Sequence, residues 1–123
     1  CAPDACALIR QNREKFHAYN LSLIAGTAPQ VLADLPAPDA VFIGGTKGSM
    51  AEVVDAALAK NPNARLCISA IALETLSAAI AVLAAHGQTA EVTQLAVSRT
   101  RPAGKLHLLM ANNPIFLITG ERI

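Results

Sequence analysis

Apolar residues recur along the chain with two spacings, and these predict alternating helices and strands. Apolar positions every three or four residues predict helices over 3–18, 49–61 and 73–86, and a capping threonine followed by proline predicts a brief helix over 27–34. Short apolar or alternating runs predict strands over 21–25, 39–43, 64–70, 91–98, 105–111 and 115–119. Alternating strands and helices indicate a parallel sheet with helices on both faces.

Local signals set the expected ends of these elements. Ser49 followed by Glu52 forms a capping-box pattern, and Gly87 is placed to end the helix before it. Residues 101–104 (Arg-Pro-Ala-Gly) predict a turn. The closing strands, joined by a short turn, predict an antiparallel hairpin appended to the sheet.

Size and composition narrow the class of protein. At 123 residues the chain is expected to form a single domain spanning 1–123. Hydrophobic residues make up 53% and charged residues 15%, which favours a folded chain over a disordered one. A net charge of +1 and an aromatic content of 3% argue against a nucleic-acid partner, which would need a basic surface or stacking side chains.

Membrane and redox signals are weak. The longest apolar stretch, 76–85, is too short to cross a bilayer, so we expect a buried helix and no membrane association.

Three cysteines, at 1, 6 and 67, form no C-x-x-C pair. This predicts free thiols in a reducing cytoplasm, with no disulfide framework and no metal site. The chain starts with Cys1 and not methionine, which suggests a fragment or a processed product.

Candidate binding residues follow from the expected sheet. Ligands of open α/β sheets bind beyond the carboxyl ends of parallel strands, which here are 26–28, 44–46 and 70–72. Glycines at the first two ends would let a ligand approach the backbone, and the following helices offer free N–H groups. The alternative is that these glycines only form turns.

Each charged side chain expected near this edge has two possible interpretations. Glu74 begins a helix, where it either contacts a ligand or complements the helix dipole. Arg99, Arg101 and Lys105 surround the predicted turn and either bind a polycarboxylate or are simply solvated. The three histidines show no ligand spacing, and no catalytic set is recognisable, so the catalytic residues stay unknown.

Five segments of the chain, in order, resemble one enzyme family. These are 26–29 (Gly-Thr-Ala-Pro), 35–45 with its PDAVFIGG run, 72–76, 97–104 and 111–115. Together they are similar to the precorrin-6Y C5,15-methyltransferases (decarboxylating) and the cobalt-precorrin C15-methyltransferases of cobalamin biosynthesis. The resemblance covers essentially the whole chain.

This resemblance implies a class I, Rossmann-like methyltransferase fold that uses S-adenosylmethionine. Carried over by position, Gly26, Thr27 and Ala28 would lie by the adenine, and Gly44 and Gly45 by the methionine end. The substrate would be a precorrin or cobalt-precorrin tetrapyrrole, which is methylated and loses an acetate carboxyl group. Glu74, Arg99 and Arg101 are then the candidates for substrate contacts, the two arginines because the macrocycle is polyanionic.

The chain also departs from the family pattern. The glycine-rich cofactor loop and the acidic residue for the ribose would lie upstream of residue 1, so the resemblance implies a sheet lacking its first two strands. Strand 41–43 would then have a bare apolar edge, which favours a homo-oligomer. Two alternatives stay open, namely a class I methyltransferase acting on RNA or protein and a non-catalytic assembly fragment.

Overall fold

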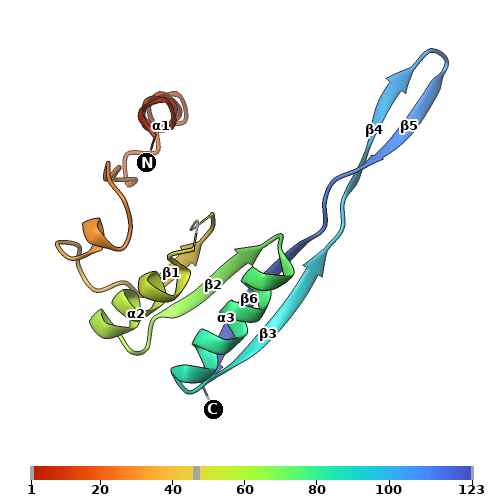
Figure 1. Cartoon of the computed structure of the whole chain (residues 1–123). Helices are drawn as coiled ribbons and strands as arrows, with labels where there is room; N and C mark the ends of the chain where they lie inside the picture. Colours follow the sequence, from red (N-terminus) through yellow and green to blue (C-terminus); the bar gives the residue numbers. More distant parts are fainter. Residues whose placement is uncertain (1, 46–47, 123) are drawn as a thin grey trace. The chain divides into compact units, whose positions relative to one another are not determined.

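The computed structural model describes residues 2–45 and 48–122, and the chain forms two compact units, Cys1–Pro36 and Ala37–Ile123. The first unit contains helix α1 (Pro3–Lys15) and the short 3-10 helix η1 (Gln30–Leu32) (Figure 1). Proline at the start of α1 and basic residues in its last turn suit the helix geometry and dipole. Thus the predicted long helix is present and ends three residues earlier than expected.

Two predictions for the first unit are wrong. Residues 21–25 form no strand, and Leu21 and Ile24 are 44% and 46% exposed. A strand needs a second strand to pair with, and among the described residues no strand pairs with this segment. Cys6, buried on α1, is disulfide-bonded, whereas Cys67 is a free thiol. Pairing of sulfurs depends on backbone geometry at both residues, which the number of cysteines does not reveal.

The second unit is built on a four-stranded mixed sheet. Its strands are β1 (Ala40–Ile43), β2 (Arg65–Ala70), β3 (Gln88–Leu95) and β6 (Ile115–Arg122), in the spatial order β1-β2-β6-β3. β1 pairs with β2 in parallel, while β6 runs antiparallel to both β2 and β3. All strands of the sheet are therefore parallel except β6, the last in sequence, which lies between β2 and β3.

Two helices cover one face of this sheet. α2 (Met50–Lys60) and α3 (Leu73–Ala85) contact each other and lie on the same side in Figure 1. Ile43, Ile68 and Ile118 share one row across the strands and are buried with Val54 and Leu83. The predicted covering of both faces is not seen among the described residues of this unit. On the other face Phe42 is 67% exposed beside a broad hollow of about 630 Å³.

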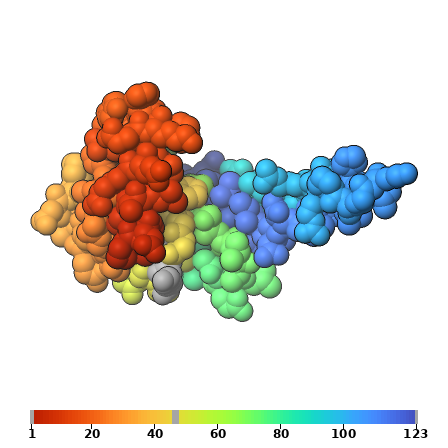
Figure 2. Space-filling model, turned by 90° about the horizontal axis from the view of Figure 1, so that it is seen from above, coloured from red at the N-terminus to blue at the C-terminus, as the bar shows by residue number. Residues whose placement is uncertain are grey.

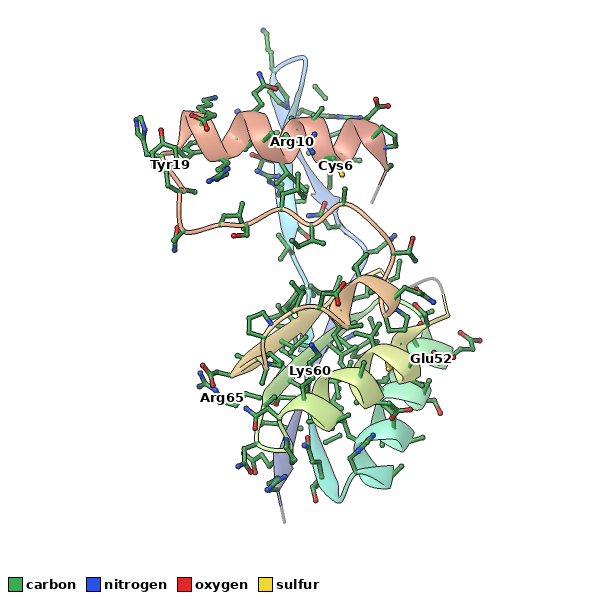
Figure 3. All side chains as sticks on the ribbon, turned by 90° about the vertical axis from the view of Figure 1, so that its left-hand side faces the viewer. Cys6, Arg10, Tyr19, Glu52, Lys60 and Arg65 are labelled. Carbon is green, nitrogen blue, oxygen red and sulfur yellow. The ribbon has the colours of Figure 1, made fainter. Side chains whose placement is uncertain are left out.

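The ends of α2 and α3 follow their sequence signals closely. Glu52 and Lys60 occupy the first and last turns of α2, at opposite ends of the helix in Figure 3. Ser49 is the N-cap residue, and its carbonyl accepts the first intrahelical bond, from Val53 N at 3.1 Å, but its side chain makes no capping hydrogen bond. The capping box itself is not formed. Gly87 ends α3 with φ +72°, a conformation that favours glycine.

The predicted hairpin is present but stands apart from the sheet. β4 (Ser98–Ala103) and β5 (Leu106–Ala111) form a separate two-stranded antiparallel sheet beyond the carboxyl end of β3 (Figure 1). Its turn is Gly104-Lys105, so the turn predicted over 101–104 is wrong and Arg101 lies within a strand. Pro102 did not end the strand, because proline is tolerated where its nitrogen faces away from the neighbouring strand.

Candidate functional site

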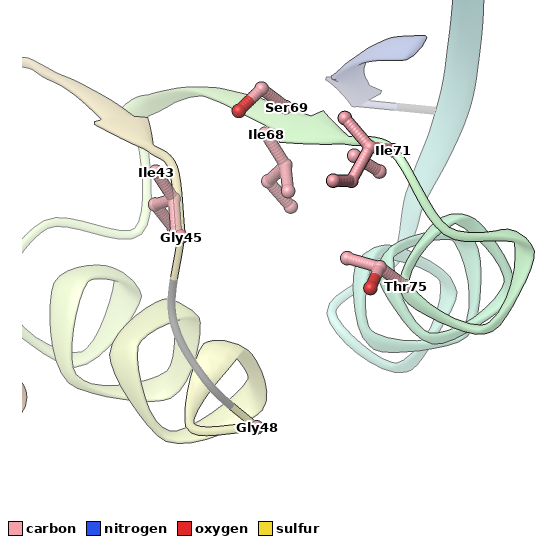
Figure 4. Close-up of a pocket in the computed structure, with 8 residues that line it drawn as sticks. Ile43, Gly45, Gly48, Ile68, Ser69, Ile71 and Thr75 are labelled. Atoms are coloured by element: carbon pink, nitrogen blue, oxygen red, sulfur yellow. The ribbon is translucent and has the colours of Figure 1, made fainter. Parts of the chain in front are cut away.

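A small pocket lies at the carboxyl ends of β1 and β2, where the chain turns into α2 and α3 (Figure 4). Its volume is about 180 Å³. It is lined by residues from both strand ends, from the segment before α2 and from the first turn of α3, namely Ile43, Gly45, Gly48, Ile68, Ser69, Ala70, Ile71 and Thr75. In parallel sheets, ligands bind at this edge, next to the N-termini of the helices that follow the strands.

The described lining of the pocket combines apolar walls with two hydroxyl residues, Ser69 and Thr75. Ile43 and Ile68 are buried at its floor, and Thr75 points toward it from α3 (Figure 4). Gly45 adopts φ +63°, and a Cβ there would have no heavy atom within 4 Å. The backbone at Gly45 is therefore open to a ligand, and glycine is also the residue that this conformation favours.

The second predicted glycine of this turn has a different neighbour. A Cβ on Gly44 would lie 3.2 Å from the Ser69 hydroxyl oxygen, so Gly44 packs against the end of β2. The Ser69 side chain lies on the opposite side of β2 from that of Ile68 (Figure 4). Gly44 is not among the lining residues of the pocket. Thr46, also predicted at this strand end, lies outside the described residues.

Gly26, Thr27 and Ala28 belong to the first unit, where local contacts account for their conformation. A Cβ on Gly26 would overlap the Val31 side chain, and Gly26 has φ +151°. The Thr27 carbonyl accepts a bond from Val31 N at 3.1 Å, and the Ala28–Pro29 peptide is cis. These residues form a tight turn into η1.

The charged candidates are exposed and lie outside the pocket lining. Glu74 is in the first turn of α3, next to the lining residue Thr75. Arg99 and Arg101 are two residues apart on β4, so they share one face of the hairpin, opposite Met110 and Leu108. The structure thus brings the two arginines together, as their spacing requires, and Lys105 occupies the turn.

Sequence reasoning missed most of the lining residues. It placed Gly45, Ala70 and Ile71 at ligand-binding strand ends but did not select Thr75, because an uncharged side chain in a first helical turn carries no signal of its own. Within residues 2–45 and 48–122, no group of three or more His, Cys, Asp or Glu side chains is arranged to hold a metal ion. None of the helices described is both long and apolar enough to span a membrane.

Comparison with known proteins places this site in a family. The family model described as "Precorrin methyltransferase domain" matches residues 1–122. The chain belongs to the precorrin methyltransferase family. A crystal structure titled precorrin-6y C5,15-methyltransferase, from Geobacter metallireducens, superposes with a TM-score of 0.88 at 35% identity, over 98% of this chain and 63% of that one. The predicted α/β fold, that of the class I methyltransferases, is thereby confirmed.

Two curated relatives agree with this assignment. A probable cobalt-precorrin-6B C(15)-methyltransferase (decarboxylating) from Pyrobaculum calidifontis is 35% identical over 94% of this chain and 60% of its own length. The cobalt-precorrin-6B C(15)-methyltransferase (decarboxylating) of Salmonella typhimurium is 34% identical over 98% of this chain and 62% of its own. This precorrin methyltransferase family chain therefore spans about three-fifths of the length of the curated relatives it matches.

Proposed function

We propose that the chain is part of an enzyme that methylates and decarboxylates a precorrin macrocycle, with S-adenosylmethionine as methyl donor, in cobalamin biosynthesis. The observation that carries this proposal is the pocket at the carboxyl ends of β1 and β2, found in a chain whose relatives are named for that reaction. We further propose that the two units belong to one methyltransferase domain of a cytoplasmic protein, since the family model runs through both.

The pocket fits one end of the methyl donor. Its volume of about 180 Å³ is below the roughly 300 Å³ at which sites for whole small molecules begin. In our proposal the unsubstituted backbone at Gly45 accommodates the methionine portion, and the Thr75 hydroxyl hydrogen-bonds to it. Gly44 supports this turn from the other side. The adenine contact that the family resemblance implies for Gly26, Thr27 and Ala28 stays a prediction. When bound, the donor supplies an electrophilic sulfonium methyl group.

Substrate recognition in this proposal uses charge and apolar area together. Arg99 and Arg101 share one face of β4 and bind carboxylates of the macrocycle, and Glu74 borders the same strand-end region. Ile71, which lines the pocket and is 75% exposed, and Leu73, 70% exposed at the start of α3, offer apolar area for the flat face of the ring. When the acetate loses carbon dioxide, the conjugated macrocycle accepts the electron pair.

Titration calorimetry with S-adenosylhomocysteine tests the proposal. The titrations use this chain and the natural polypeptide that contains it, each with a Thr75→Val variant. Loss of one hydrogen bond predicts a Kd about 3- to 10-fold higher for Thr75→Val. Thr93→Val, at an exposed position of β3, is the matched control and leaves Kd unchanged. Equal affinity of the Thr75→Val variant and the parent polypeptide would contradict the assignment of this pocket.

A further inference from the structure

Glu74 lies at the boundary between the two binding surfaces of the proposed reaction. It follows Leu73, part of the apolar surface assigned to the macrocycle, and precedes Thr75, which lines the pocket assigned to the methyl donor. Successive residues of an α-helix are turned by about 100°, so Glu74 lies between these two neighbours on the surface of the first turn of α3. The reacting atoms of the donor and the macrocycle must meet at this boundary.

The carboxyl group of Glu74 is available for chemistry at this place. The side chain is exposed, and the start of α3 lies open on the surface of the second unit, in green in Figure 2. Among the residues that the structure describes, no hydrogen bond or ion pair engages this carboxyl group. A carboxylate in a first helical turn complements the helix dipole, and that role leaves its oxygens able to take up a proton.

Other acids and bases are scarce at the strand ends. None of the described residues that line the pocket has an acidic or basic side chain. The first turns of the two helices contain one carboxylate each, Glu52 in α2 and Glu74 in α3. Only Glu74 adjoins a lining residue, because the lining residue of the other segment is Gly48, which precedes α2. Among the described residues of this edge, Glu74 is therefore the group best placed for acid–base catalysis.

The proposed reaction requires such a group. When an acetate arm loses carbon dioxide, the carbon–carbon bond breaks and its electron pair enters the conjugated ring. The ring uses that pair to bond the methyl group from the donor sulfonium, and the arm is left as an exocyclic methylene carbon. This carbon becomes a methyl group when it gains one proton and the ring gives up one proton. The sequence of steps balances without an oxidant or a reductant.

We propose that the Glu74 carboxylate carries this proton, accepting it from the ring and donating it to the methylene carbon. A carboxylate suits both halves of the transfer because it is a base before the first half and an acid before the second. The inference rests on the proposed function and deepens it by assigning the proton transfer to a residue. Arg99 and Arg101, which bind carboxylates in that proposal, cannot take this role because a guanidinium keeps its proton.

Kinetics of the natural polypeptide that contains this sequence test the role. Glu74→Gln is compared with Glu52→Gln, because both replace an exposed glutamate in a first helical turn. Turnover is followed by NMR as the new methyl group that replaces the acetate arm. Glu74→Gln is expected to lower kcat about 100- to 10,000-fold, the usual contribution of acid–base catalysis, and to leave the KM for the macrocycle within about 3-fold of the parent value. Glu52→Gln should keep the parent kcat.

A second variant separates proton transfer from a structural role. Glu74→Ala leaves space for formate, a small carboxylate, which is expected to restore turnover at least about 10-fold and in proportion to its concentration. An unchanged kcat for Glu74→Gln, a rise in the KM for the macrocycle alone, or a loss that formate does not restore would overturn the role of Glu74. If the parent polypeptide itself forms neither S-adenosylhomocysteine nor carbon dioxide from the macrocycle, the proposed function fails as a whole.

Discussion

Asn61 and Pro38 are 23 residues apart in sequence and joined by a hydrogen bond of 2.8 Å from Asn61 Nδ2 to the Pro38 carbonyl oxygen. The same side chain accepts a bond from Asn63 N through its Oδ1 at 2.9 Å. Asn61 ends α2, and Pro38 precedes β1, whose pairing with β2 begins at the bond from Arg65 N to the Asp39 carbonyl. One half-buried amide thus joins the loop before β2 to the segment before β1.

Replacement of Asn61 tests this connection. We expect Asn61→Ala to lower the free energy of unfolding by about 1–2 kcal/mol, because it leaves the Pro38 carbonyl without this donor. Urea denaturation followed by circular dichroism measures the change. Asn63→Ala, whose backbone N–H survives the substitution, should fall within about 0.5 kcal/mol of the parent chain. A loss as large for Asn63→Ala would show that the turn, and not the amide, matters.

Gly120 and Gln88 give a second test of packing inside the sheet. A Cβ on Gly120 would overlap Gln88 Oε1 and lie 3.0 Å from Leu83 Cδ2, and both neighbours are buried. We expect Gly120→Ala to destabilise the chain by about 1–3 kcal/mol through overpacking. Truncation in Gln88→Ala makes room, so the double variant should lose less than the sum of the single changes. If the losses of the two single variants simply added in the double variant, the overpacking would not involve Gln88.

The two faces of α3 should respond differently to truncation. Leu83 is fully buried against the sheet, whereas Ile80 on the same helix is 41% exposed. Leu83→Ala should cost about 2–5 kcal/mol, since it removes methyl groups and leaves a cavity. Ile80→Ala retains the same helix and should cost clearly less. Thermal unfolding of the two variants side by side measures the difference, and similar losses would contradict the packing of α3 described above.

Arg101 provides a kinetic test of substrate binding by the hairpin. In the natural polypeptide that contains this sequence, we expect Arg101→Ala to raise KM for the macrocycle about 10- to 100-fold, the effect of losing a charge-assisted hydrogen bond. KM for S-adenosylmethionine should stay unchanged. Arg65→Ala, an exposed arginine at the start of β2, is the control. If Arg101→Ala left the KM for the macrocycle unchanged, Arg101 would not contribute to substrate binding.

The sequence alone determined the elements whose signals are local. Periodic apolar positions located α2, β2 and α3 to within one or two residues, and Gly87 marked the end of α3. These predictions succeed because a helix satisfies its hydrogen bonds within one segment and its apolar stripe reports burial directly. The PDAVFIGG run and four further segments likewise carried the family, which the family model confirms.

The tertiary structure decided everything that depends on pairing between distant segments. It placed β6 antiparallel between β2 and β3, set β4 and β5 apart as their own sheet, and left residues 21–25 without a strand. It also brought Thr75 to the strand ends beside Gly45, where the sequence had pointed to Glu74. A strand exists only through its neighbour, and a pocket only through the several segments that line it, so neither can be read from one stretch of sequence.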